Sequence, residues 1–240
     1  MKIDLMHGDC LELMKQIPDN SIDFCLTDPP YGTTACKWDS VIPFEPMWKE
    51  LKRIVKDNGA IALFGSEPFS SRLRMSNLKM FKYDWVWEKT KPTGYQICKI
   101  KPLSIYENIS IFSIGKTDYF PIMIPREKKR RGAIYSTNNQ MKISKGGVYK
   151  VFKEYTHKFP TNIIKVSNGS QKNKLHPTQK PVALLEYLIK TYTLEGETVL
   201  DFTMGSGSTG VAAKNLNRNF IGIEKELKYF EIAKQRIENA

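Results

Sequence analysis

The sequence predicts an α/β fold in which helices cover both faces of a mostly parallel β-sheet. Three observations support this prediction. Apolar, strand-like segments alternate with amphipathic helical segments along most of the chain. A glycine-rich turn follows one of these strands and opens a helix, as in nucleoside-binding units. Of the 240 residues, 41% are hydrophobic and 26% are charged, which is typical of a globular protein with a core.

The expected strands are short runs of apolar and β-branched residues. The first ends at Asp9, and the others lie at residues 21–27, 60–65, 83–88, 108–115, 198–202 and 219–224. The expected helices repeat apolar residues at three- and four-residue intervals. A short one begins at Asp9, which has capping-box spacing to Glu12, and the others lie at residues 44–59, 181–193, about 205–216 and 226–238.

The amino-terminal segment and the cysteines bear on the cellular compartment. Acidic residues at positions 4 and 9 come too early for a secretory signal, and no apolar run approaches the roughly 18 residues of a membrane span. The four cysteines, at positions 10, 25, 36 and 98, have neither CxxC spacing nor a histidine at metal-ligand spacing. We therefore expect a cytoplasmic protein with reduced thiols, no membrane contact and no metal site.

The positive charge of the chain is concentrated in one segment. Residues 116–175 contain 14 Lys and Arg against three acids, whereas the rest of the chain contains 23 against 22. Such a local excess suits a polyanion, either nucleic acid or an anionic membrane surface, although a solvated lysine-rich loop would share this composition. We expect residues 1–115 and 176–240 to form one domain, interrupted by a basic insert at 116–175.

The glycine-rich turn is the first motif with a chemical meaning. Gly205, Gly207 and Gly210 form a GxGxxG pattern between the strand at 198–202 and a helix, and Glu224 follows 19 residues after Gly205. Glycines let the backbone approach a ligand, and the helix amino terminus offers N–H groups to an anion. Glu224 is placed to accept hydrogen bonds from ribose hydroxyls. The pattern predicts a nucleoside cofactor without identifying it.

The second motif is Asp28-Pro29-Pro30-Tyr31, directly after the strand at 21–27. A residue before proline is extended, so Asp28 continues its strand to the carboxyl end, where open α/β sheets bind ligands. The prolines lack N–H groups, which leaves a stiff segment with outward carbonyl groups. A carboxylate and a carbonyl together can accept the two hydrogens of an amino group, and Tyr31 offers a flat face for a base.

With these motifs the chain resembles the amino-methylating DNA methyltransferases of the β class, and is particularly similar to small enzymes of phages and prophages. The resemblance extends over nearly the whole chain and rests on HGDC (7–10), TDPPYG (27–32), ALFGSEPF (62–69), WVWEKTKPTG (85–94), YENISIF (106–112), HPTQKP (176–181) and DFTMGSGSTG (201–210). It implies a Rossmann-like fold with a seven-stranded sheet, a circularly permuted motif order and a target-recognition region in the basic insert.

The resemblance also implies S-adenosylmethionine as the cofactor. The segment expected to hold its methionine portion consists of Asp201, Phe202, Gly205, Ser206 and Gly207, with Glu224 on the ribose. Asp9 and Cys10 are expected at the adenine end, and His176, Thr178 and Lys180 over the methionine carboxylate. His176 could instead be a helix-entry residue, and Lys180 a solvated lysine. Many relatives read DPFxGSG where this chain has DFTMG, so the aromatic Phe202 is displaced by one position.

The expected reaction is transfer of a methyl group to N6 of adenine. Asp28 and the Pro29 carbonyl would accept both amino hydrogens, so that the nitrogen lone pair points at the methyl group. The base would be flipped out of double-stranded DNA and stacked on Tyr31. The residues expected to contact DNA are those of the densest basic run, Arg126, Lys128, Lys129, Arg130 and Arg131. Dimerisation and a cognate restriction enzyme are compatible with the resemblance.

Two other reactions remain open at this point. Cytosine N4 is the nearest alternative, although relatives acting on cytosine more often have serine in place of Asp28. A nicotinamide-dependent oxidoreductase would share the glycine turn and Glu224, but it gives no role to DPPY, HPTQKP or the basic insert.

Overall fold

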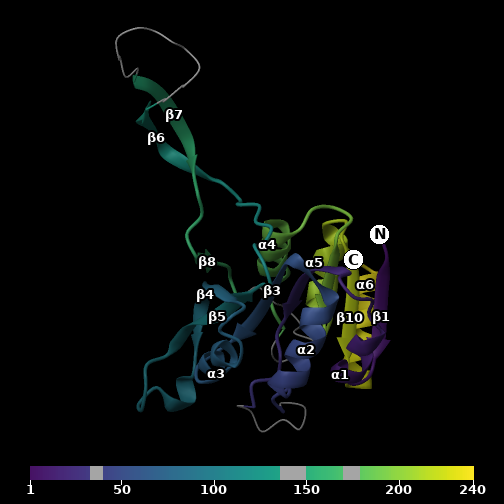
Figure 1. Ribbon diagram of the computed structural model, residues 1–240. Helices are drawn as coiled ribbons and strands as arrows, with labels where there is room; N and C mark the ends of the chain where they lie inside the picture. Colours follow the sequence, from purple (N-terminus) through teal and green to yellow (C-terminus); the bar gives the residue numbers. More distant parts are fainter. Residues whose placement is uncertain (33–39, 136–149, 170–178) are drawn as a thin grey trace. The chain divides into compact units, whose positions relative to one another are not determined.

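The computed structural model describes residues 1–32, 40–135, 150–169 and 179–240 (Figure 1). The chain divides into two compact units. The large unit comprises Met1–Phe120 and Asn162–Ala240, and the small unit comprises Pro121–Thr161. Among the helices of the described ranges, none is long and apolar enough to cross a bilayer.

An eight-stranded sheet forms the centre of the large unit, in the order β1-β10-β9-β2-β3-β5-β4-β8. Its strands are β1 (Ile3–His7), β2 (Ile22–Thr27), β3 (Val55–Gly65), β4 (Phe81–Thr93), β5 (Ser104–Phe112), β8 (Ile163–Lys165), β9 (Thr198–Asp201) and β10 (Asn219–Glu224). All neighbouring pairs are parallel except β3–β5 and β4–β5. The mostly parallel α/β sheet is confirmed. It has one strand more than the seven expected, because β8 pairs with the edge strand β4 and buries Ile164.

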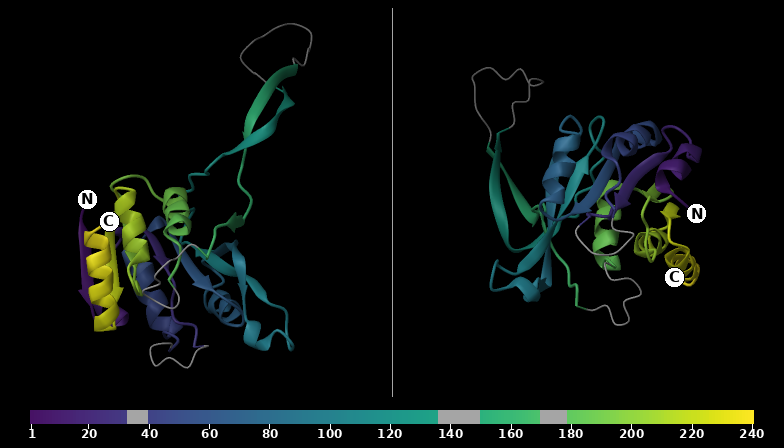
Figure 2. Two further views of the ribbon diagram at one scale, coloured as in Figure 1. Left: turned by 180° about the vertical axis from the view of Figure 1, so that it is seen from behind. Right: turned by 90° about the horizontal axis from the view of Figure 1, so that it is seen from below.

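Helices cover both faces of this sheet, as Figure 2 shows in the view from below. One layer contains α4 (Val182–Tyr192), α5 (Ser208–Asn215) and α6 (Leu227–Glu238), and the other contains α1 (Cys10–Leu13), α2 (Phe44–Ile54) and α3 (Phe69–Ser76). Each layer has its own buried cluster. Phe24, Val199 and Phe220 face the first layer, whereas Ile61 and Leu200 face the second. These residues alternate along their strands, as a sheet buried on both faces requires.

The helix expected at 44–59 ends five residues early, at Ile54, and the chain continues directly into β3. Val55 pairs with Ile22 of β2 and takes an extended conformation. Gly59, expected to end the helix, instead allows β3 to approach β2, because a Cβ there would lie 2.9 Å from the carbonyl oxygen of Asp23. Tertiary strand pairing thus overrides the helical periodicity of this segment. Helix α3 was not among the expected elements.

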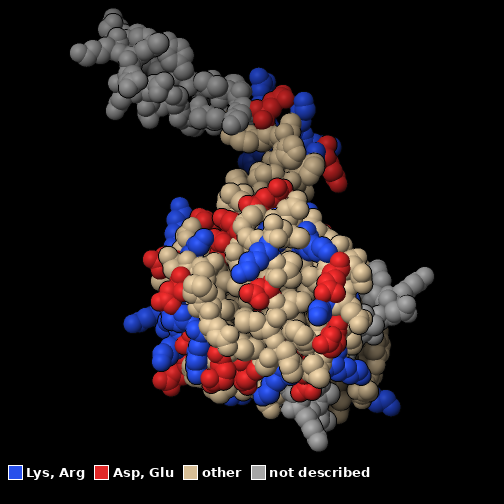
Figure 3. Space-filling view, turned by 90° about the vertical axis from the view of Figure 1, so that its right-hand side faces the viewer, with Lys and Arg blue, Asp and Glu red and all other residues tan. Residues whose placement is uncertain are grey.

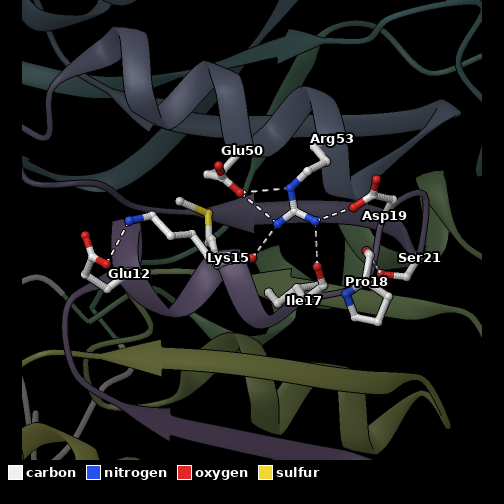
Figure 4. Close-up of polar contacts among 9 residues, drawn as sticks. Glu12, Lys15, Ile17, Pro18, Asp19, Ser21, Glu50 and Arg53 are labelled. Carbon is white, nitrogen blue, oxygen red and sulfur yellow. Dashed lines mark hydrogen bonds and ion pairs between the residues drawn. The ribbon is translucent and has the colours of Figure 1, made fainter.

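Arg53 at the end of α2 fixes this helix against the segment that follows α1 (Figure 4). Its guanidinium donates to the carbonyl groups of Met14 at 2.8 Å and Ile17 at 2.9 Å. It also pairs with Glu50 at 2.7 Å and with Asp19. The planar guanidinium group has five N–H donors and can bind several carbonyl groups at once. Arg53 therefore holds in place the segment between α1 and β2.

The small unit is a two-stranded antiparallel sheet of β6 (Ile124–Tyr135) and β7 (Lys150–Lys158). It is shorter than the insert expected at 116–175, because both flanks belong to the large unit. Phe120 N donates to the Thr191 carbonyl at 2.8 Å, and β8 joins the central sheet. The described part of the basic segment therefore contains regular strands where the sequence lacked clear periodicity.

Candidate active site

The site begins where two central strands end side by side. Strands β2 and β9 are parallel neighbours, with Phe24 opposite Val199 and Cys25 opposite Leu200. The DPPY segment follows β2, and the glycine turn follows β9. From β2 the chain continues toward β3, and from β9 toward β10, so the strand order diverges between them. Open α/β sheets bind ligands at such a switch point, outside the carboxyl ends of the strands.

Asp201 holds the two segments together from the end of β9. Its carboxylate is buried and accepts hydrogen bonds from the hydroxyl groups of Thr27 and Thr209, the latter at 2.6 Å, and from Thr203 N at 3.1 Å. Burial raises the pKa of Asp201 to about 6, against these hydrogen bonds, which favour the ionised form. Asp201 thus connects β2, the glycine turn and α5 from within the protein.

A cavity of about 370 Å³ lies over these strand ends. Twelve of the residues expected to bind cofactor or base line it: Asp9, Cys10, Asp28, Pro29, Pro30, Tyr31, Lys180, Asp201, Phe202, Gly205, Ser206 and Glu224. Carboxylates share its wall with apolar side chains such as Val41, Ile42 and Leu185. Its size and mixed lining suit a nucleoside-sized ligand. His176 and Thr178 lie outside the described residues.

Among the described residues that were expected to bind cofactor or base, Gly207 does not line this cavity. It has a left-handed backbone with φ of 78°, and a Cβ there would lie 2.8 Å from the Cβ of Ala233 in α6. A Cβ on Gly210 would lie 2.3 Å from Cδ1 of Ile237 in the same helix. These two glycines therefore permit close packing of the turn and α5 against α6, rather than approach to a ligand.

Glu224 closes the other side of the glycine turn. Its carboxylate accepts hydrogen bonds from Gly205 N at 2.9 Å and from Glu226 N at 2.8 Å. Burial raises its pKa, against the backbone N–H groups that favour the ionised form. A carboxylate has about four lone-pair sites, so it can still accept hydrogen bonds from a ribose.

Asp9 and Cys10 form the part of the cavity that follows β1. Asp9 caps α1 by accepting a hydrogen bond from Leu11 N at 3.0 Å, and Lys225 lies 3.2 Å from its carboxylate. Burial, followed by the neighbouring Asp9 charge, raises the pKa of the Cys10 thiol to about 12. Cys10 therefore remains a neutral thiol and contributes shape rather than a nucleophile.

Hydrogen bonds from other side chains hold both the carboxylate and the main-chain carbonyl of Asp28 in place. Its carboxylate accepts hydrogen bonds from the Tyr31 hydroxyl group and, at 2.5 Å, from Nζ of Lys180. Its main-chain carbonyl accepts a hydrogen bond from Thr203 at 3.2 Å. The ring of Tyr31 stacks on Phe69, with ring centroids 4.9 Å apart. These contacts hold the DPPY segment in place in the wall of the cavity.

Lys180 belongs to a network of four charged side chains, in which the two lysines are buried and the two carboxylates are half-buried. Its ammonium group lies 2.5 Å from Asp28 and 3.2 Å from Glu107, and Glu107 in turn pairs with Lys89 at 2.5 Å. Lys180 also lies over the ring of Phe64, 4.9 Å from its centroid. Lys180 is therefore not the solvated lysine considered as an alternative. Its ion pairs within the described chain are with protein carboxylates, and its role toward the cofactor stays a prediction.

Several groups of this site were missed from the sequence. Glu107 lies within the YENISIF segment, which carried part of the resemblance but received no role. Thr27, Thr203 and Thr209 hold Asp28 and Asp201 in place. The available signal for the threonines was their position, because Thr27 ends β2, Thr203 follows β9, and Thr209 lies in the first turn of α5.

The five basic residues expected to contact DNA lie on β6 of the small unit. Arg126 donates to the His157 carbonyl at 3.1 Å, and Lys129 forms an exposed ion pair with Glu154 at 3.4 Å. Arg130 and Arg131 are consecutive strand residues, so their side chains leave opposite faces of the hairpin.

The fold and the cavity define a methyltransferase-like nucleoside-binding domain, and comparisons with known proteins identify its family. A family model described as DNA methylase, of the N6/N4 type, matches residues 22–235. The type II methyltransferase M.HinfI of Haemophilus influenzae is 30% identical, with 97% of this chain and 67% of that protein covered. M2.DpnII of Streptococcus pneumoniae is 29% identical, with 99% and 90% covered. The solved complex of M1.HpyAVI with SAM has a TM-score of 0.64 and 26% identity, with 98% of each chain covered.

The chain therefore belongs to the N6/N4 DNA methylase family. It is an S-adenosylmethionine-dependent DNA methyltransferase that acts on an amino group of a base. The predicted class of enzyme and its cofactor are confirmed.

Proposed function

We propose that this protein methylates N6 of adenine within a specific sequence of double-stranded DNA, after the base has been extruded from the helix. The observation that carries this proposal is the position of Asp28. Its half-buried carboxylate lines the same cavity as the glycine turn. The type II methyltransferases among the relatives support site-specific action.

The lining of the cavity fits S-adenosylmethionine, a nucleoside with hydroxyl groups and positive charges. Asp9, Glu224 and Asp201 supply acceptors, and Phe202 and Leu185 supply apolar walls. We infer that Glu224 holds the ribose and that the glycine turn holds the methionine portion. When bound, the cofactor supplies an activated methyl group on a sulfonium.

The protein has to make a poor nucleophile reactive. The lone pair of an aromatic amino group is delocalised into the ring. Asp28 and the Pro29 carbonyl would accept hydrogen bonds from its two N–H groups and favour a tetrahedral nitrogen. Positioning and charge would therefore supply most of the catalysis. Because Thr203 and Tyr31 already fix the DPPY segment, little reorganisation is needed at the moment of reaction. Tyr31 is stacked on Phe69, which supports its ring as a platform for the base.

Adenine is favoured over cytosine by Asp28 itself, since the resemblance associates serine at this position with N4 methylation. We further propose that the small unit is the target-recognition part of the enzyme. It has ten Lys and Arg against two acids over residues 121–161. Its basic strand β6 can contact phosphates from either face.

The test is the chemistry of the product. Unmethylated plasmid DNA treated with the enzyme and S-adenosylmethionine, then digested to nucleosides, should contain N6-methyladenine by mass spectrometry. Asp28→Ala should abolish incorporation while cofactor binding measured by calorimetry stays within about threefold, because the acceptor acts chiefly in the transition state. N4-methylcytosine as the product would show that the methylated base is cytosine and not adenine. Turnover of the variant within tenfold of wild type would remove Asp28 from the mechanism.

A further inference from the structure

The end of β4, the start of β5 and the segment that joins them leave the body of the large unit as an arm, defined here as residues 90–106. None of these residues is buried. Large apolar side chains nevertheless stand in solvent: Tyr95 is 64% exposed, Ile100 is 84% exposed, and Ile97, Ile105 and Tyr106 are also exposed. Apolar side chains gathered on one projecting element indicate a surface that a partner covers.

The charge of the arm identifies the kind of partner. Lys91, Lys99 and Lys101 lie within residues 90–106, and the segment has no Asp or Glu. A surface of lysines and apolar side chains complements DNA, with phosphates for the cations and base edges or faces for the apolar groups. Contact between two copies of the arm would instead place their lysines against each other.

The topology places the arm beside the active site. Strand β5 is antiparallel to β3, and β4 is antiparallel to β5. Strand β4 therefore runs parallel to β3 and β2, and its carboxyl end lies at the edge of the sheet from which Asp28 extends. Figure 1 shows the turn between β4 and β5 at the lower edge of the sheet, as it does α1, which follows the carboxyl end of β1. DNA that delivers a base to Asp28 has to approach this edge.

The base of the arm is also connected to Asp28. Lys89 and Glu107 flank the arm and form an ion pair at 2.5 Å, in which Lys89 is buried and Glu107 is half-buried. Glu107 lies 3.2 Å from Lys180, which pairs with Asp28 at 2.5 Å. The two residues at the base of the arm thus belong to the same network of charged side chains as Asp28.

We propose that the arm contacts the DNA duplex next to the extruded base. Its apolar side chains pack against the bases that extrusion leaves unstacked, and Lys99 and Lys101 contact the neighbouring phosphates. Extrusion costs stacking free energy, which apolar contacts at the gap offset in other proteins that distort DNA. The inference rests on the base extrusion of the proposed function and adds a second DNA-contacting surface, in the large unit.

Two double variants test the two contacts. Tyr95→Ser with Ile100→Ser removes the most exposed apolar groups, and its control is Met75→Ser with Leu78→Ser. Met75 and Leu78 are 69% and 58% exposed, and they precede β4 at the opposite edge of the sheet. Lys99→Ala with Lys101→Ala removes two charges, and its control is Lys79→Ala with Lys82→Ala, at that same opposite edge.

Methyl incorporation into plasmid DNA should fall about tenfold or more in the apolar arm variant, with the melting temperature and S-adenosylmethionine affinity unchanged. The lysine arm variant should flatten the slope of log affinity against log salt for a fluorescein-labelled duplex, by about 0.9 for each lost phosphate contact. Both control variants should behave as wild type.

The inference is overturned if the arm variants match their controls. It is also overturned if sedimentation shows a wild-type dimer that the arm variants convert to monomers, because the arm would then be a subunit interface. A wild-type protein that adds no methyl group to DNA would refute the proposed function. The salt slope would still decide whether the arm binds DNA, since that measurement needs no catalysis.

Discussion

The ionisation of Asp28 depends on the side chains packed around it. Burial raises its pKa most, Lys180 opposes this effect, and the nearby charge of Glu107 adds to the rise. Tyr31 donates a hydrogen bond that favours the carboxylate, and Asp201 lies close enough to interact with it. Ionised Asp28 accepts hydrogen bonds from an amino group more strongly than the protonated acid does, so activity should fall as the pH drops through its raised pKa.

Replacing Lys180 should therefore move the acid limb of the pH–rate profile to higher pH. Lys180→Met removes the cation that favours ionised Asp28 and leaves the half-buried carboxylates of Asp28 and Glu107 without the cation that they share. The pKa of Asp28 should rise further, and on the acid side of the profile kcat should fall by about a factor of ten for each unit of that rise. The measurement is kcat on plasmid DNA from pH 5.5 to 9 with saturating cofactor.

Lys225→Met is the matched control for this experiment. Lys225 also lines the cavity, but it pairs with Asp9 and is mostly exposed. Its removal should leave the acid limb in place. If Lys180→Met lowered kcat equally at all pH values, Lys180 would act through packing alone and the electrostatic role would be wrong.

At the scale of elements, the glycine turn connects the cavity to α6. Gly205 and Ser206 line the cavity, whereas Gly207 and Gly210 face α6. Arg236 of α6 donates to the Ser206 hydroxyl oxygen at 3.0 Å. A substitution at the second glycine should therefore disturb the helix first and the cofactor second.

Gly207→Val should lower the melting temperature. The new Cβ would lie within 3 Å of Ala233, and the residue would keep a positive φ that valine disfavours. Gly196→Val is the control, because Gly196 has a φ of 81° with open space around its Cβ position. We expect Gly207→Val to melt about 5 °C below this control, for roughly 2 kcal/mol of overpacking. Equal melting temperatures with lost cofactor affinity would instead return Gly207 to a direct role in cofactor binding.

At the scale of the whole molecule, charge is divided unequally along the chain. On the face of the large unit seen in Figure 3, Lys and Arg are intermingled with Asp and Glu. The small unit contains ten Lys and Arg against two acids. Long-range attraction of DNA should therefore depend mainly on the small unit.

Neutralising Arg126, Lys128, Lys129, Arg130 and Arg131 together should weaken binding to all DNA sequences alike. Each lost phosphate contact should flatten the salt slope by about 0.9. The side chains of Arg130 and Arg131 leave opposite faces of β6, so a single duplex on one face cannot contact all five residues. We therefore expect at least two phosphate contacts to be lost, but fewer than five. Fluorescence titrations at several salt concentrations measure this, and an unchanged slope would mean that β6 does not contact phosphates.

Much of the fold could be predicted from local pattern. The strand at 219–224 lies as expected, and β2, β9, α4 and α6 differ from expectation by at most one residue at each end. These segments have strong periodicity and clear end signals. The end of α2 could not be predicted, because Val55 continues the helical pattern and only its pairing with Ile22 makes it a strand residue. Strand β8 has three residues, too few for a periodic signal.

The sequence by itself determined the DPPY motif, the nucleoside-binding glycine turn and the place of the basic segment, because each depends on residues close together in the chain. Only the tertiary structure decided what their side chains contact. Lys180 pairs with Asp28 across 152 positions, and Gly207 meets α6 rather than the cavity. Such contacts depend on which strand ends and helices become neighbours, and this is set by the packing of the whole sheet.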